Sequence, residues 1–378
     1  MAAPPSDWID PIDRHFRAKG WARGVVAFDA DTLAPIRAEI EALWAQRRAG
    51  SRDAFATHRP ELPRLHRLSP TLGAFVRHPV LIALAQRIIG PNVDMLWNQA
   101  HCKGPGGHGL GRYPWHQDGF YAPVEPTGGY SCWIALTPTR ADNGAIAGVT
   151  RSDDRRLRPH TWNPELAYYV CEVADDEVDV LEMALGEFLL FDNMWPHASG
   201  PNTTDAPRIG YSLSYAHTGT RLIATGETYG DRVPVVRDGR AIDEVMAELA
   251  RDPSSPGPGR RALEELTGRM PEIADLIAAR FAAYRDAVLA DDTARAERTL
   301  TELICSAPDE AIVLGDLLRS RGVPDELRRE LRDLGTRDLT ARRLLLGRLL
   351  ELDPGDDDAR RELAALDART TAGPFDAG

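Results

Sequence analysis

Several features are scarce in this sequence of 378 residues, and each scarcity argues against a class of protein. The four cysteines lie far apart with no CxxC pair, which argues against a disulfide framework or a zinc knuckle and predicts reduced thiols. No apolar run approaches the roughly 18 residues of a transmembrane helix, and the first residues lack the apolar core of a secretory leader. The net charge of −12 disfavours nucleic acid as a partner. We therefore expect a cytoplasmic protein without a membrane or nucleic-acid partner.

Tryptophan is absent from the last third of the chain, and this change in composition indicates two parts. All eight tryptophans lie at or before Trp195. The stretch RDPSSPGPGRR, residues 251–261, has the proline, glycine and serine content of a linker or a long loop. We interpret residues 1–240 as a first domain, residues 241–262 as a linker and residues 263–378 as a helical domain.

The C-terminal part has apolar residues at the three-to-four spacing of helices. Its stretch LLELDPGDDDARRELAAL is similar to the end of a tetratricopeptide-type helical repeat, but no clear period of about 34 residues accompanies it. We expect these charged helices to form a solvated cap, a homodimer contact or a docking element for another protein. We identify no catalytic set among them.

The N-terminal part begins with helices and continues with short strands. Residues 24–28, GVVAF, are typical of a strand, and apolar residues at helical spacing predict helices over 32–44 and 78–90. Asp31 or Thr32 is the expected N-cap of the first helix. After the second helix, short strand-like runs alternate with glycine, proline and asparagine turns. This pattern predicts a mainly β fold, a sandwich or a barrel, with flanking helices.

The stretch YPWHQDGFY places His116 and Asp118 on alternate positions. If it is a strand, both side chains point to one face and can converge on a metal ion. The best third ligand is His197, which follows a strand-like run that begins at Gly186. Two histidines and one carboxylate with open positions suit non-haem Fe(II). Arg208, eleven residues after His197, can bind a distal carboxylate through two parallel hydrogen bonds.

These residues resemble the phytanoyl-CoA dioxygenase family of Fe(II)- and 2-oxoglutarate-dependent oxygenases. The resemblance covers about residues 15–225 and rests on WHQDGFY, SCWIALTPTRADNGAI and HASGPNTTDAPR. It implies a double-stranded β-helix, the cupin-like jelly roll, followed here by an all-α C-terminal region. By this resemblance, iron would be bound by His116, Asp118 and His197, and 2-oxoglutarate would be contacted by Ser199, Arg208 and Trp133.

The resemblance also implies a reaction that consumes dioxygen and 2-oxoglutarate and releases succinate and carbon dioxide. An unactivated C–H bond of a small organic molecule would be hydroxylated or otherwise oxidised. The family usually continues from the pair Asn143 and Gly144 into a segment similar to PGSH, whereas this chain reads NGAIAGVTRSDDRRL. Because that loop often borders the substrate, the departure leaves the substrate open. It is one reason why we favour a role in natural-product biosynthesis.

Two other interpretations remain open. A zinc-dependent hydrolase or isomerase on a related barrel would use the same three ligands and a bound water, but it gives Ser199 and Arg208 no role. A non-catalytic binding protein would keep the barrel and act through its helical tail.

Further candidate site residues lie beside these motifs. In WNQAHCK, alternate residues share one face of a strand, and this face either lines the interior or is solvated. The face holds Trp97, Gln99, His101 and Lys103, of which Gln99 and Lys103 are the expected co-substrate contacts. Aromatic residues near the ligands form either pocket walls or core, and Tyr113 is one of these. The candidate substrate contacts are His101, Gln117, Phe120, Tyr121, Asn143 and Trp195.

Overall fold

The computed structural model describes residues 8–24, 28–50, 61–106, 111–152, 154–163, 168–224, 226, 228, 230–306, 331, 346, 349–350 and 355–371. The chain divides into two compact units by contact: residues 1–268 with 276–305, and residues 269–275 with 306–378. The first unit holds both large β-sheets.

Among the described residues, four α-helices come before the long strands of the core: α1 (Ile9–Lys19), α2 (Ala30–Gly50), α4 (Pro70–Phe75) and α5 (Pro79–Ile88). The helices predicted over 32–44 and 78–90 are confirmed as α2 and α5. The expected N-cap of α2 is wrong, because the Asp29 carboxylate accepts the hydrogen bond from the Thr32 backbone nitrogen, at 2.7 Å. The chain therefore enters this helix earlier than its apolar pattern indicates.

The first strand, β1 (Trp21–Gly24), begins earlier than the predicted strand over 24–28. Residues 25–27 lie outside the described residues. Gly20 ends α1 in the left-handed region, at φ 76°, which glycine adopts without steric cost. This turn lets β1 follow α1 immediately and pair with a strand far along the sequence, from Trp21 opposite Phe191 to Gly24 opposite Phe188.

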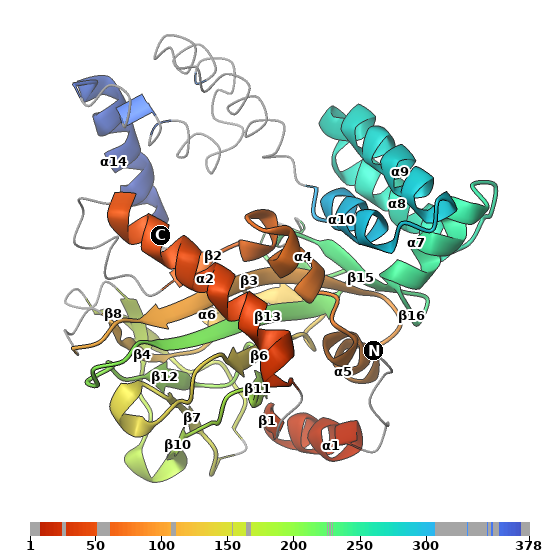
Figure 1. Ribbon diagram of the computed structural model, residues 1–378. Coiled ribbons are helices and arrows are strands. Elements are labelled where there is room, and N and C mark those ends of the chain that lie inside the picture. The colour runs from red at the N-terminus through yellow and green to blue at the C-terminus, as the bar shows by residue number, and fades with distance from the viewer. Residues whose placement is uncertain are drawn as a thin grey trace. The chain divides into compact units, whose positions relative to one another are not determined.

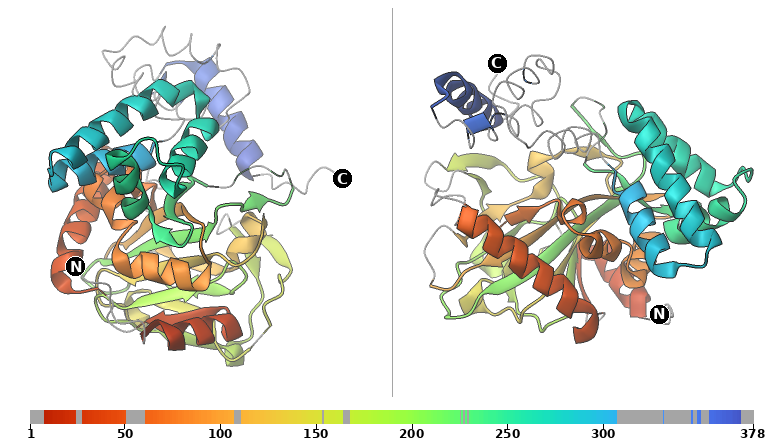
Figure 2. Two further views of the ribbon diagram at one scale, coloured as in Figure 1. Left: turned by 90° about the vertical axis from the view of Figure 1, so that its right-hand side faces the viewer. Right: turned by 45° about the horizontal axis from the view of Figure 1, so that its top comes forward.

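The core is a jelly roll made of two antiparallel sheets (Figures 1 and 2). The larger sheet has the order β1-β11-β6-β13-β3-β15-β16, and β2 pairs with β3 beside this path. Its other strands are β2 (Glu61–Pro63), β3 (Val93–Lys103), β6 (Tyr130–Ala135), β11 (Phe188–Phe191), β13 (Arg208–His217), β15 (Val233–Arg237) and β16 (Arg240–Ala241). The smaller sheet, β10-β7-β12-β4, consists of β4 (Tyr113–His116), β7 (Ile146–Val149), β10 (Val178–Leu181) and β12 (His197–Ser199). The predicted mainly β fold with a double-stranded β-helix core is confirmed.

Two short β-ribbons and a short helix complete this core. The ribbons pair β5 (Val124–Glu125) with β14 (Arg221–Leu222) and β8 (His160–Asn163) with β9 (Tyr168–Cys171). Helix α6 (Asp118–Tyr121) begins one residue after the end of β4, with Gln117 between them. The metal-site motif therefore spans a strand end and a helix start.

Strand alternation gives the large sheet one helix-covered face and one face toward a cavity. On β13, the Tyr211 ring stacks on Phe75 of α4 at 5.9 Å between centroids, and Tyr215 donates a hydrogen bond to the Val76 carbonyl at 2.8 Å. Ser212 and Ser214, at alternate positions of the same strand, line the cavity. The large sheet therefore separates the helical layer from the site.

The next helices after β16 are α7 (Ile242–Arg251), α8 (Pro258–Arg269), α9 (Ala274–Leu289) and α10 (Thr293–Ile304). Helix α7 packs against β15 and β16, and α10 packs against α4. Arg77, next to α4, donates a hydrogen bond to Thr301 Oγ1 of α10 at 3.1 Å. α7 and α10 thus lie in the same compact unit as the sheets.

Residues 241–262, the predicted linker, hold α7 and the start of α8. This segment forms a helix because Ile242, Val245 and Leu249 make a buried stripe on α7. The proline- and glycine-rich residues only turn the chain between α7 and α8. A separate helical domain from residue 263 stays a prediction. Most of residues 307–354, and so most of the tetratricopeptide-like stretch, lie outside the described residues, although α14 (Asp357–Thr371) is helical as expected. Among the described helices, none combines the length and apolar character that a membrane crossing requires.

Candidate metal centre

Three side chains meet at one end of the small sheet. His116 ends β4, Asp118 begins α6 and His197 begins β12, and the two histidines lie opposite each other in the β12–β4 pairing. One ligand atom from each residue lies within 4.8 Å of the other two. The predicted strand alternation from His116 to Asp118 is wrong, because β4 ends at His116. The turn into α6 brings the carboxylate to the histidines instead.

Backbone carbonyls orient both imidazole rings. His116 Nδ1 lies 2.8 Å from the Pro114 carbonyl oxygen, and His197 Nδ1 lies 3.0 Å from the Trp195 carbonyl oxygen. An Nδ1–H that donates to a carbonyl leaves the Nε2 lone pair for a metal, which is the usual arrangement of metal-binding histidines. The His116 Nε2 atom lies 3.6 Å from Asp118 Oδ1.

The electrostatics favour the protonation states that bind a cation. Burial, followed by the neighbouring His116, lowers the pKa of His197 to about 4, so its imidazole is neutral at neutral pH. Burial acts to raise the pKa of Asp118, but the hydrogen bond with His116 and the electrostatic influence of the two neighbouring imidazoles, which favours the carboxylate form, outweigh it, and the pKa is lowered. The Asp118 side chain is 43% exposed, and this area faces the cavity, where surrounding protein atoms still desolvate it. Neutral imidazole and ionised carboxylate are the ligand forms that divalent metals require.

Arg208, the first residue of β13, lies buried beyond the metal ligands. Its Nη2 donates to the Gly144 carbonyl at 2.7 Å and to Ser199 Oγ at 3.1 Å. Its Nε is buried with no hydrogen-bond partner among the described residues, so one N–H of the guanidinium is available to an anion. Burial lowers its pKa to about 10, which leaves it charged at neutral pH. The donor set fits a carboxylate of a co-substrate.

Trp133 and Lys103 shape the surroundings of this arginine differently. The Arg208 Cζ lies 5.3 Å from the Trp133 ring centre, and Trp133 lines the cavity. Gly210 permits this approach, because a Cβ there would lie 1.8 Å from Trp133 Cζ2. Lys103 donates to Ser199 Oγ at 2.5 Å and to the Gly200 carbonyl, and it is not among the residues that line the cavity. It therefore holds Ser199 in place from behind.

A cavity of about 320 Å³ connects these parts. The β3 face that carries Trp97, Gln99 and His101 lines it, so this face is not solvated. Burial lowers the pKa of His101 to about 3, which keeps its ring neutral. The predicted site residues that line the cavity are His101, His116, Asp118, Tyr121, Trp133, His197, Ser199 and Arg208, together with Gln99 and Tyr113.

Four predicted substrate contacts have other partners and do not line the cavity. Phe120 stacks on His160 at 4.2 Å between ring centroids, and Trp195 donates from Nε1 to the Val149 carbonyl at 2.7 Å. The Asn143 amide caps its own turn, where it accepts from the Arg140 backbone nitrogen at 2.7 Å. The fourth residue is Gln117.

Many cavity residues were not identified from the sequence. Among them are Glu61, Tyr168, Asn193, Ser131, Ser212 and Ser214. Two of the serines follow Arg208 at even spacing on one strand, so alternation within RIGYSLSY was a usable signal. Glu61 and Tyr168 come from distant segments with no motif, and only the folded chain places them here.

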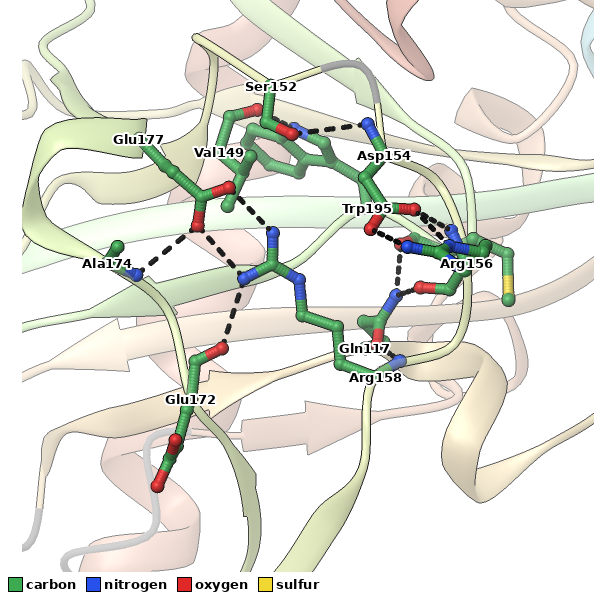
Figure 3. Close-up of polar contacts among 11 residues, drawn as sticks. Gln117, Val149, Ser152, Asp154, Arg156, Arg158, Glu172, Ala174, Glu177 and Trp195 are labelled. Carbon is green, nitrogen blue, oxygen red and sulfur yellow. Dashed lines mark hydrogen bonds and ion pairs between the residues drawn. The ribbon is translucent and has the colours of Figure 1, made fainter.

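Gln117 connects the two ligand-bearing segments with the loop after β7 (Figure 3). Its amide nitrogen donates to the Met194 carbonyl at 2.5 Å and to the Arg156 carbonyl at 2.9 Å, and its oxygen accepts from the Arg158 backbone nitrogen at 2.8 Å. Arg158 in turn pairs with Glu177 at 3.1 Å. The loop that departs from the family pattern is therefore fastened to the residue between His116 and Asp118.

We expect Gln117→Ala to weaken Fe(II) binding by roughly tenfold without abolishing it, the lower end of the usual effect of removing an outer contact of a metal site. Titration of the metal-free protein with Fe(II) under anaerobic conditions measures this. Gln117→Glu keeps the acceptor for Arg158 but loses both donors, so we expect an intermediate affinity. Wild-type affinity in Gln117→Ala would mean that the network does not position the ligands.

A jelly roll with two histidines and one carboxylate around one point, and a buried arginine beyond them, defines a non-haem Fe(II) oxygenase with an anionic co-substrate. The chain belongs to the phytanoyl-CoA dioxygenase (PhyH) family, whose model matches residues 16–210. The family uses Fe(II) and 2-oxoglutarate, and the ligand triad and Arg208 fit both. Family membership favours the oxygenase over the zinc hydrolase. Arg208 supports the same choice, because a zinc hydrolase would give it no role.

The chain is also similar to solved structures, and the first of these has the same fold. The non-heme monooxygenase ThoJ in its apo form has a TM-score of 0.50 and 20% identity, over 61% of this chain and 84% of that chain. The epimerase SnoN in complex with Fe3+, alpha ketoglutarate and nogalamycin RO has a TM-score of 0.48 and 18% identity, over 58% of this chain and 87% of that chain. EvdO2 from Micromonospora carbonacea var. aurantiaca, complexed with 2-oxoglutarate, has a TM-score of 0.48 and 20% identity, over 57% of this chain and 93% of that chain. No curated protein sequence matches the chain.

Proposed function

We propose that this protein oxidises an unactivated C–H bond of a small organic molecule, by hydroxylation or a related outcome, in natural-product biosynthesis. The observation that carries the proposal is a cavity of about 320 Å³. It is lined by the ligand triad, by Arg208 and by additional residues that neither the metal nor the co-substrate needs. This size lies at the lower end of the range of roughly 300–1,000 Å³ found for small-molecule sites.

The residues of the chain have distinct tasks in this reaction. Fe(II) held by the triad, with 2-oxoglutarate and dioxygen, supplies the oxidising chemistry and releases succinate and carbon dioxide. Arg208 binds the distal carboxylate of 2-oxoglutarate, and Ser199, fixed by Lys103, adds a hydroxyl beside it. The Trp133 ring walls this end against water. The Trp97 side of the cavity then remains for the substrate.

The test begins without a substrate. We expect Fe(II) and 2-oxoglutarate, added to the metal-free protein without oxygen, to give a weak visible absorption band that needs both. Admission of oxygen should then release succinate slowly, and a true substrate should raise this rate and gain one oxygen atom or lose two hydrogens by mass spectrometry. Tight zinc binding with no band would contradict the proposal.

A further inference from the structure

One stretch of the cavity wall carries no charged side chain. Its described lining residues come from segments 96–99, 122–131 and 212–216, which include parts of the neighbouring strands β3, β6 and β13. None of these lining residues is an aspartate, a glutamate, a lysine, an arginine or a histidine. A charged group placed against them would lose hydration and gain no counter-charge from them. This stretch therefore favours a neutral ligand.

The strand register brings neutral polar side chains together on this wall. Ser212 of β13 lies opposite Gln99 of β3 on one side and opposite Trp133 of β6 on the other. Two positions further along β13, Ser214 lies opposite Ser131 of β6. All five residues line the cavity, so their side chains share one face of the sheet. Directly opposite residues have Cβ atoms roughly 5 Å apart, which makes Ser212 and Gln99 neighbours on that face.

Gln99 and Ser212 have hydrogen-bond donors that the described residues do not use. Trp97 donates from Nε1 to Gln99 Oε1 at 3.1 Å. Because an indole nitrogen only donates, this bond identifies the Gln99 oxygen and leaves its Nε2 without a partner among the described residues. The Ser212 hydroxyl has no partner among them either, although Ser212 is only 7% exposed. Buried polar groups are nearly always hydrogen-bonded, so two unused donors side by side favour a ligand atom that accepts from both.

The two donors lie apart from the arginine that binds the co-substrate. Ser212 comes four residues after Arg208 on β13, which is about 13 Å at the usual rise of a strand. The Trp133 ring lies over Gly210, between these two positions, since a Cβ on Gly210 would be 1.8 Å from Trp133 Cζ2. The sequence predicts Gln99 as a co-substrate contact, but its place opposite Ser212 favours contact with the substrate.

We propose that the substrate is a neutral molecule with a carbonyl or hydroxyl oxygen that accepts hydrogen bonds from Gln99 Nε2 and Ser212 Oγ. This inference rests on the proposed function and names the substrate class and two specificity residues of the same site. Two bonds to one oxygen fix one end of the molecule, so that a C–H bond at a set distance from that oxygen faces the metal ligands. An ammonium group offers these donors no acceptor, and a carboxylate finds no counter-charge on this stretch of wall.

Binding of small probes that share a phenyl ring tests this substrate class. Acetophenone, 1-phenylethanol, ethylbenzene, 1-phenylethylammonium and benzoate are titrated by calorimetry at pH 7 into the protein loaded with Fe(II) and 2-oxoglutarate, without oxygen so that no turnover occurs. We expect acetophenone and 1-phenylethanol to bind roughly tenfold more tightly than ethylbenzene, because each of two neutral hydrogen bonds adds a modest net stabilisation. Both charged probes should bind more weakly than acetophenone.

Variants at the two donors assign the preference to these residues. Gln99→Leu and Ser212→Ala each remove one donor, so we expect each to lower the preference for acetophenone over ethylbenzene to about threefold. The double variant should bind the two probes alike. The affinity for 2-oxoglutarate should stay close to that of the wild type in all three proteins, which a co-substrate contact would not allow. Gln46→Leu, at an exposed position on α2, is the matched control and should bind every probe as the wild type does.

The outcomes separate this inference from the proposed function. A wild type that binds ethylbenzene as tightly as acetophenone, that prefers a charged probe or that binds no probe overturns the inference. A double variant that keeps the preference, or a Gln99→Leu protein that loses only its 2-oxoglutarate affinity, overturns it as well. The visible band of Fe(II) with 2-oxoglutarate is recorded for each protein. A normal band without the probe preference defeats only the substrate class, whereas absence of the band in the wild type defeats the proposed function.

Discussion

The His116→Ala protein should retain no Fe(II) after gel filtration, where the wild type retains about one ion per chain. The physical reason is that the remaining pair, Asp118 and His197, offers only two ligand atoms, while the third coordination position falls open to water. Iron analysis and the visible band with 2-oxoglutarate measure the loss. Because His116 is 5% exposed, its removal also leaves a small void, and thermal unfolding should show that the variant is folded.

A matched histidine variant controls for general effects of the substitution. His217 is exposed at the end of β13, where its Nδ1 accepts from the Gly219 backbone nitrogen at 2.9 Å. His217→Ala should bind iron as the wild type does. Unchanged iron stoichiometry in His116→Ala would defeat the assignment of the ligand triad.

The Arg208→Ala protein should bind 2-oxoglutarate roughly ten- to a hundred-fold more weakly, while its affinity for Fe(II) stays close to that of the wild type. Loss of a charge-assisted pair costs about 1.5–3 kcal/mol. The unpartnered Nε of Arg208 shows that the guanidinium has a donor to offer, and no metal ligand is its hydrogen-bond partner. Titration of 2-oxoglutarate into the Fe(II) protein, followed by the visible band, measures the change.

Arg208→Lys distinguishes charge from geometry at this position. A lysine keeps the positive charge but not the planar fork that grips a carboxylate with two bonds. We expect its 2-oxoglutarate affinity to lie between those of the wild type and the alanine variant. If Arg208→Ala binds 2-oxoglutarate normally, another residue holds the distal carboxylate.

Much of the fold could be predicted because its elements have local signals. Helices α2 and α5 have clear apolar periodicity, and the strands after α5 alternate with turn residues. The first strand was misplaced, because GVVAF is more apolar than WARG, whereas the turn at Gly20 determines where the strand begins. Helix α7 was not predicted, because the proline and glycine residues that follow it are typical of a linker, although α7 has its own apolar stripe.

The ligand triad could be predicted, but the substrate wall could not. His116, Asp118 and His197 are specified by spacing within two motifs. Glu61 reaches the cavity because β2 pairs beside β3, and Tyr168 reaches it through the β8–β9 ribbon, and neither pairing leaves a mark in the sequence. Gln117 is a candidate substrate contact from the sequence, but its amide donates to two backbone carbonyls and it does not line the cavity.

The place of β12 in the small sheet has a consequence for the metal-free protein. This strand of three residues lies between β7 and β4, so His197 is opposite Gly148 on one side and His116 on the other. Backbone hydrogen bonds on both sides hold this strand, and they break only when the sheet opens locally. The two histidines therefore keep their spacing when iron is stripped, and reloading requires no refolding. Asp118, on a helix of one turn and with its side chain 43% exposed, is held less firmly than the two histidines, so metal loss should affect its position more than theirs.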